Sequence, residues 1–110
     1  MKAAALVLIT ALLPLPLFAA SFSCKQATAP DEKAICANRV LNDKDVEMTT
    51  KFRFLTGLFA MGTRGNMQDQ QRQWLANRQR CGSDVSCLKA SYDRRIAELD
   101  KVYNAIDRPL

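Results

Sequence analysis

The sequence predicts an all-α fold, a small disulfide-stapled bundle of three to four helices. Three observations support this fold class. Apolar residues recur at helical spacing along most of the chain, no segment shows the alternation of a strand, and four cysteines follow an N-terminal segment of secretory type. The 110 residues leave about 90 once the first 20 are removed, which suits one small helical domain over 21–110. A core of that size is modest, so covalent staples would add needed stability.

The first 20 residues have the layout of a cleaved secretory signal peptide. One lysine, Lys2, precedes a long apolar run, and small residues follow the run at Ala19, Ala20 and Ser21. The cut could fall after any of these three. The segment predicts export to the periplasm or the exterior of a bacterial cell, where an even number of cysteines indicates disulfides.

Two other interpretations of this segment fit less well. A membrane anchor is opposed by Pro14 and Pro16, which interrupt the end of a run already near the lower length limit for a bilayer span. A lipoprotein signal would make Cys24 the lipidated residue. Such a signal has a small residue directly before the cysteine and an apolar residue three positions before it. Ser23 fits the first requirement, but Ser21 stands at the second position. We therefore expect no stable membrane span.

The first two helices follow from capping residues and apolar spacing. Thr28 and Pro30 suit the start of a short helix that ends near Ala37. Asn38 suits the cap of a second helix that runs to about Met61. One apolar stripe of the second helix predicts a core face: Leu41, Met48, Phe52, Leu55 and Phe59.

A second apolar stripe on the same helix is formed by Phe54, Leu58 and Met61. At about 100° per residue, this stripe points roughly 130° away from the first. Two interpretations stay open. In one, the helix is the central element of the bundle and both stripes are buried. In the other, the second stripe is an apolar surface that docks a partner.

Glycines and an asparagine over 62–66 predict a break after the second helix, with Arg64 at the tip of the connecting loop. The loop is either a plain connector or a projection into a partner's cleft. A third helix is expected over about 67–80. Its Trp74 is interpreted as a core anchor or, alternatively, as a binding residue, and Arg78 can stack on the indole. Gly82 then suits a left-handed helix end.

Four cysteines permit three pairings. Cys24 and Cys36 bracket the start of the first helix, and Cys81 and Cys87 enclose the corner before a fourth helix over about 85–105. Short loops close without long-range geometry, so the sequence favours Cys24–Cys36 and Cys81–Cys87. A crossed pattern that joins the two halves of the chain is the alternative.

The composition opposes catalysis. The chain has no histidine, which removes the most common general base and metal ligand. With the cysteines oxidised, neither a zinc site nor a thiol nucleophile can be built. We expect a protein that is not an enzyme and has no cofactor and no metal. The formal net charge of +5, about +4 without Lys2, comes without a basic run of five, so no nucleic-acid partner is expected.

A pattern of cysteines and their neighbours covers nearly all of 21–110. Its parts are Phe22-Ser23-Cys24, the segment Thr28–Cys36, Leu41 with Asp45, the run Gln71–Cys81 that contains Trp74 and Arg78, and the run Cys87–Leu99 that contains Tyr92 and Arg95. In this pattern the chain resembles the LprI-type lysozyme-inhibitor family, which consists of small exported bacterial four-cysteine helical domains.

The resemblance implies an all-helical, disulfide-bonded domain that binds and inhibits lysozyme and so protects the cell wall. Lys44 departs from it, because the family has an apolar residue at this place in the second helix. Animal lysozymes of the common type are basic, as this chain is, and like charges slow association. A peptidoglycan hydrolase of acidic character suits the charge better.

Two functions follow as hypotheses. The first is an exported binding protein, inhibitor-like or with a toxin-immunity role, that blocks a lysozyme or other peptidoglycan hydrolase. Its candidate contact residues are Arg64, which would pair with the catalytic carboxylates, and the stripe Phe54, Leu58 and Met61. The second is a periplasmic structural or adaptor protein that self-associates through this stripe or binds anionic envelope surface. The oligomeric state stays open.

Overall fold

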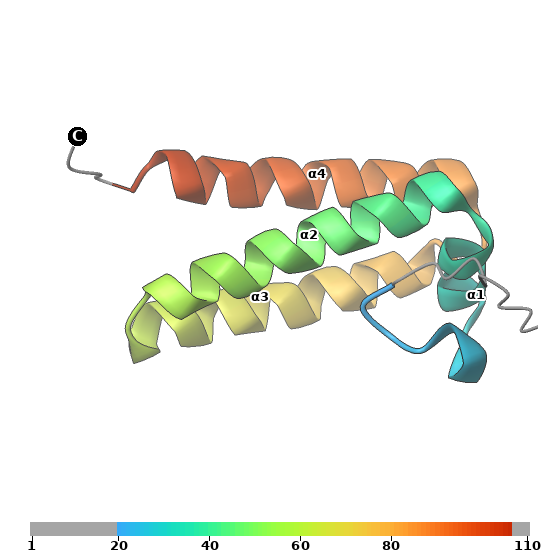
Figure 1. Ribbon diagram of the computed structural model, residues 1–110, viewed down its shortest axis with the longest axis horizontal. Coiled ribbons are helices and arrows are strands. Elements are labelled where there is room, and N and C mark those ends of the chain that lie inside the picture. Colours follow the sequence, from blue (N-terminus) through green and yellow to red (C-terminus); the bar gives the residue numbers. More distant parts are fainter. Residues whose placement is uncertain (1–19, 107–110) are drawn as a thin grey trace, which may run out of the picture.

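A computed structural model describes residues 20–106, which form one short 3-10 turn and four α-helices (Figure 1). In chain order these are η1 (Cys24–Gln26), α1 (Pro30–Ala37), α2 (Arg39–Leu58), α3 (Met61–Arg80) and α4 (Val85–Asn104). Four helices, with no strand over residues 20–106, confirm the all-α prediction. The predicted signal peptide lies outside the described residues except for Ala20.

The helices α1 and α2 form where the local sequence favours them. Proline opens α1, and acidic residues follow in its first turn. The N-cap of α1 is Ala29, whose side chain cannot cap, so Thr28 does not have the capping role expected of it. Asn38 caps α2 as predicted, and its side-chain oxygen accepts a 3.1 Å hydrogen bond from the backbone N–H of Leu41.

The junction between α2 and α3 differs from the prediction. The expected loop over 62–66 is wrong, because α2 ends at Leu58 and α3 already begins at Met61. Two extended residues, Phe59 and Ala60, make the turn. The glycines at 62 and 65 have no positive φ angle and are part of the first turns of α3. Glycine weakens a helix because it is a poor helix former, but it does not prevent one. Neither Gly62 nor Gly65 adopts the left-handed conformation that a glycine turn would use.

The corner between α3 and α4 matches its prediction. Gly82 has a φ of 57°, the left-handed conformation that ends many helices. Asp84 then caps α4, and its carboxylate accepts a 3.1 Å hydrogen bond from the backbone N–H of Cys87. The chain therefore reverses within four residues, and α4 runs back along α2 and α3 (Figure 1).

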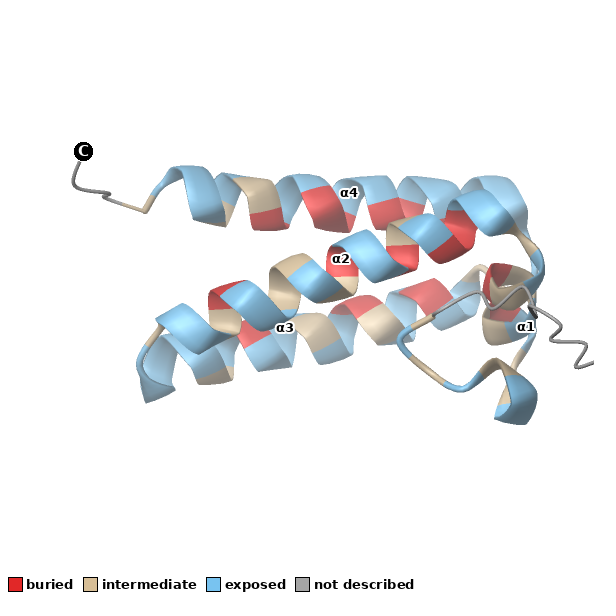
Figure 2. Cartoon of the chain, in the orientation of Figure 1, coloured by how far each residue is buried: buried red, intermediate tan, exposed pale blue. Residues whose placement is uncertain are grey.

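The core lies between the three long helices, with α1 across one end (Figures 1 and 2). Its buried apolar side chains are Ile35, Leu41, Met48, Leu55, Met67, Trp74, Leu88, Tyr92, Ile96 and Leu99. The first stripe of α2 supplies three of them, while Phe52 and Phe59 are partly buried. Trp74 is a core anchor: its indole N–H donates to the backbone oxygen of Ser91 at 3.1 Å.

Lys44 on α2 has a partner on α4. Its Nζ lies 2.5 Å from a carboxylate oxygen of Asp93. The ion pair joins α2 to α4. Exposed ion pairs contribute about 0–1 kcal/mol, so this pair adds little to the stability of the fold.

Candidate partner-binding surface

The second stripe of α2 is exposed. The exposed fractions are 55% for Phe54, 53% for Leu58 and 84% for Met61, which is the first residue of α3. The interpretation in which both stripes are buried is therefore wrong. The reason is that α3 and α4 both pack on the side of α2 that carries Leu41, Met48 and Leu55.

Tyr103 extends this apolar surface onto α4. Its ring lies 6.4 Å from the ring of Phe54, and 40% of the residue is exposed. We call Phe54, Leu58, Met61 and Tyr103 the hairpin-end surface, because they lie toward the end of the α2–α3 hairpin. The sequence does not single out Tyr103 as a binding residue. It lies seven residues after Ile96 on α4, a spacing that is typical of a core position.

Two apolar hollows lie beside the hairpin-end surface. The first, of about 350 Å³, is lined by Thr50, Lys51, Phe54, Leu55, Leu99, Asp100 and Tyr103. The second, of about 460 Å³, is lined by Phe59, Val102, Ala105 and Ile106. Figure 1 shows the cause: α4 and the α2–α3 hairpin separate toward the C-terminal end of α4. The apolar side chains of α2 and α4 that line the two hollows therefore do not close on each other.

A charged rim borders the first hollow. The ammonium group of Lys51 lies 2.7 Å from Asp100 on α4 and 2.8 Å from Glu47 on its own helix. The hydrogen bonds to Asp100 and Glu47 raise the pKa of Lys51 above its ordinary value, so the group stays charged. An apolar centre with a polar rim is the usual anatomy of a protein–protein interface.

Arg64 is not a projecting tip. Its Nε donates to the backbone oxygen of Thr56 at 2.9 Å, and its Nη2 donates to that of Phe59 at 3.1 Å. These carbonyls stand at the C-terminal end of α2, where intrahelical partners are missing and positive charge is favoured. The guanidinium therefore fastens the first turn of α3 to the end of α2 instead of reaching outward.

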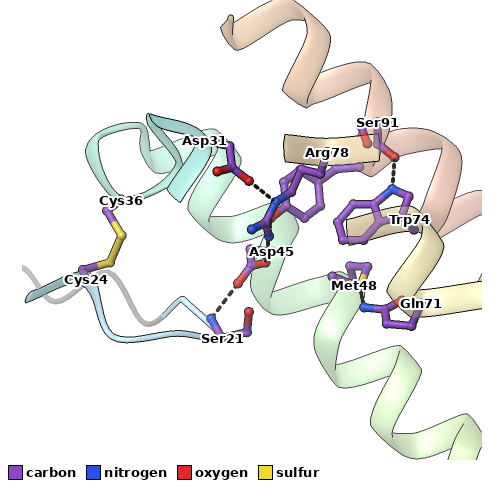
Figure 3. A network of polar contacts seen from close by, with 11 residues as sticks. Ser21, Cys24, Asp31, Cys36, Asp45, Met48, Gln71, Trp74, Arg78 and Ser91 are labelled. Carbon is purple, nitrogen blue, oxygen red and sulfur yellow. Dashed lines mark hydrogen bonds and ion pairs between the residues drawn. A yellow bond between two sulfur atoms is a disulfide. The ribbon is translucent and has the colours of Figure 1, made fainter. Parts of the chain in front are cut away.

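A buried polar network holds the other end of the molecule (Figure 3). Arg78 on α3 donates from Nε to Asp31 on α1 at 2.8 Å and from Nη1 to the Tyr92 hydroxyl on α4 at 3.2 Å. The Tyr92 hydroxyl donates in turn to Asp45 on α2 at 2.7 Å. Each of the four helices contributes one residue, and each of the four residues is at most 3% exposed.

The network is structural and not reactive. Burial raises the pKa of Tyr92 far above its ordinary value and Asp45 raises it further, so Tyr92 remains a neutral donor. Burial alone would lower the pKa of Arg78, but its interactions with Tyr92 and Asp31 raise it above the usual value. Neither group titrates near neutral pH, and both are sealed from solvent. Such groups do not meet a substrate.

Two disulfides reinforce the same end. Cys24 pairs with Cys36 and ties η1 to α1, and Cys81 pairs with Cys87 across the corner between α3 and α4. These are the pairs that the sequence favoured. The molecule is thus stapled at the α1 end and apolar at the hairpin end. None of the four cysteines is a free thiol.

Over residues 20–106 no group of three acidic, cysteine or histidine residues is placed to hold a metal ion. None of the described helices is both long and apolar enough to cross a membrane. Comparison of the chain with protein-family models, with curated proteins and with solved structures gave no match.

Proposed function

We propose that the protein is an exported, non-catalytic binding protein that blocks a peptidoglycan hydrolase of acidic character. The observation that carries this proposal is the hairpin-end surface. Phe54, Leu58 and Met61 are each more than half exposed on a domain whose opposite end is fixed by two disulfides and a buried polar network.

The hairpin-end surface favours a protein as the partner. Contiguous apolar patches are rarely left exposed on monomers without a binding role. Aromatic residues and methionine are enriched in the centres of interfaces, and this surface offers Phe54, Tyr103 and Met61.

Charge and family resemblance favour a wall hydrolase as that protein. Glycoside hydrolases carry a pair of carboxylates in the active-site cleft. This chain has 16 basic and 11 acidic residues, and Arg53 and Lys101 are exposed on the two helices that supply Phe54 and Tyr103. The excess of basic over acidic residues in the whole chain suits a partner of acidic character. The resemblance to the LprI-type family points to the same class of target.

A lytic assay tests the proposal. The purified protein is added to a panel of lysozymes and bacterial wall hydrolases, both acidic and basic, and the clearing of a cell-wall suspension is followed. We expect inhibition of an acidic member. Leu58→Asp should weaken it by about tenfold or more, as expected for a central interface residue. Val40→Asp is the matched control, because Val40 is 54% exposed on the same helix at the stapled end.

Two results would overturn the proposal. One is a complete lack of inhibition and binding across the panel. The other is an oligomer in light scattering that dissociates on Leu58→Asp and is indifferent to every hydrolase. The second result would support the alternative function, a structural or adaptor protein that self-associates. Binding to anionic vesicles or lipopolysaccharide alone would favour an envelope-surface role in the same way.

A further inference from the structure

The backbone N–H of Ser21 donates a hydrogen bond to the buried carboxylate of Asp45 (Figure 3). The distance from Ser21 N to Asp45 Oδ2 is 2.6 Å, and the other carboxylate oxygen accepts from Tyr92. Asp45 has no exposed surface. Ser21 is the residue that would follow a signal peptide of 20 residues, so the contact lies at one of the expected cleavage positions.

The network around Asp45 lacks one positive charge. It contains the carboxylates of Asp31 and Asp45 and the guanidinium of Arg78, while Tyr92 is neutral. Arg78 is shared unevenly: its Nε lies 2.8 Å from Asp31, but its Nη1 lies 4.0 Å from Asp45. A buried carboxylate without a close cation is costly, and a neutral amide N–H offsets only part of that cost.

We propose that cleavage between Ala20 and Ser21 completes this network, because it turns the Ser21 nitrogen from an amide into an ammonium group that pairs with Asp45. The proposal depends on the chain being exported with a cleaved signal peptide. A signal peptidase, a serine endopeptidase, uses one water molecule. The bond between the Ala20 carbonyl carbon and the Ser21 nitrogen breaks. The carbon takes the hydroxyl of the water and becomes a carboxylic acid, and the nitrogen takes the remaining proton of the water and becomes an amine. The acid then releases its proton and the amine binds one, which leaves a carboxylate on Ala20 and an ammonium group on Ser21.

The next residues hold the Ser21 nitrogen in place. The ring of Phe22 lies 5.5 Å from the guanidinium carbon of Arg78, within the range of a cation–π contact. Cys24 is bonded to Cys36 on α1. The segment from Ser21 to Cys24 is therefore anchored at three points, and a new chain end at Ser21 would stay beside Asp45 without rearrangement.

The proposal selects one of the three possible cuts. A cut after Ala19 would leave the Ser21 nitrogen as an amide, and a cut after Ser21 would remove it. Mass spectrometry and N-terminal sequencing of the protein recovered from the periplasm should find Ser21 as the first residue. A chain that begins at Ala20 or at Phe22 would overturn the proposal.

A stability comparison tests the ion pair itself. Two forms are released from a cleavable fusion, one that begins at Ser21 and one that begins at Ala19. The form with the free Ser21 ammonium should have a folding equilibrium constant about tenfold larger, as expected for a charge-assisted contact over a neutral one. Asp45→Asn should abolish this difference. Asp43→Asn, an exposed aspartate on the same helix, should preserve it.

The pKa of the Ser21 ammonium gives a second measurement if Asp45→Asn does not fold. The carboxylate of Asp45 favours the charged form of the Ser21 ammonium, while Arg78 in the network and Arg53, which lines the hollow beside Ser21, oppose it. The remaining groups of the network are Asp31 and the neutral Tyr92. Because Asp45 is in direct contact with the nitrogen, the ammonium pKa should exceed the usual 7.7–8.0 of a chain end. A raised pKa stabilises the fold below about pH 8, and this contribution is lost as the pH rises through the folded-state value. Equal stability of the two forms, or an ammonium pKa at or below the usual range, would contradict the proposal.

Discussion

The hydroxyl of Tyr92 on α4 donates a 2.7 Å hydrogen bond to the carboxylate of Asp45 on α2, and neither residue has any exposed surface. The same hydroxyl accepts from Arg78 Nη1 at 3.2 Å. One phenol oxygen therefore links a buried anion to a buried cation across the bundle. Its loss would leave both charges with fewer partners inside the protein.

Tyr92→Phe should destabilise the protein by about 1–3 kcal/mol. The ring still fills its place in the core, so the loss comes from the buried donor and acceptor that lose their partner. Urea unfolding followed by circular dichroism measures the change. Tyr103→Phe is the control at a partly exposed tyrosine and should have a smaller effect. A Tyr92→Phe variant as stable as the natural protein would mean that the bond contributes nothing.

The stability should fall at alkaline pH because of Tyr92. Burial and the neighbouring Asp45 raise its pKa far above the ordinary 10.0. The unfolded chain releases this proton near pH 10 and the folded chain does not, so the contribution is complete below about pH 10 and is lost as the pH rises further. Urea unfolding at a series of alkaline pH values should show a shallower decline for Tyr92→Phe. Parallel declines of the two proteins would contradict this assignment.

Arg78→Met should destabilise the protein by about 3–5 kcal/mol, because it leaves the buried carboxylates of Asp31 and Asp45 without their guanidinium. The thermal unfolding midpoint measures the effect. Arg80→Met removes an exposed arginine from the last turn of the same helix and should change stability by about 0.5 kcal/mol or less. Combining Arg78→Met with Asp31→Asn should recover part of the loss, and no recovery would argue against the ion pair.

Each disulfide should add measurable stability. Chain-entropy estimates for loops of these lengths give about 3 kcal/mol for Cys24–Cys36 and about 2 kcal/mol for Cys81–Cys87, whose sequence separations are 12 and 6. Both cysteines of one bridge are replaced by serine, and chemical unfolding measures the free energy of unfolding of each double variant. The loss should be larger for Cys24–Cys36 than for Cys81–Cys87. A larger loss at Cys81–Cys87 would mean that the bridge acts mainly on the native corner, since a shorter loop restricts the unfolded chain less.

Local chemistry made much of the fold predictable. Asn38 caps α2, Gly82 ends α3 in the left-handed conformation, and Trp74 is a core anchor, as the sequence predicts. The cap at Asn38 and the helix end at Gly82 depend on neighbours within a few residues, whereas Trp74 is held by contacts with Ser91 and Tyr92 on α4. The glycines over 62–66 predict a loop, but the segment is helical in the structure. Arg64 fastens it by donating to the backbone oxygen of Thr56, in the last turn of α2, and to that of Phe59, the C-cap of α2.

The buried network and the full hairpin-end surface needed the structure. Asp31 and Tyr92 stand singly on separate helices, and Asp31 is 47 residues from its partner Arg78. No local pattern joins residues at such separations. Tyr103 looks like a core residue by its spacing, but it is exposed because α4 separates from the hairpin near its C-terminal end. The pattern showed that α2 has two apolar sides, and only the packing shows which one is covered.

Amide hydrogen exchange would show whether a wall hydrolase docks on the hairpin-end surface. Exchange is measured by mass spectrometry for the protein alone and in complex with a hydrolase that it inhibits. We expect new protection over residues 54–61 and 99–106 and none over 24–40 at the stapled end. New protection at the stapled end, with unchanged exchange at the hairpin end, would contradict this docking.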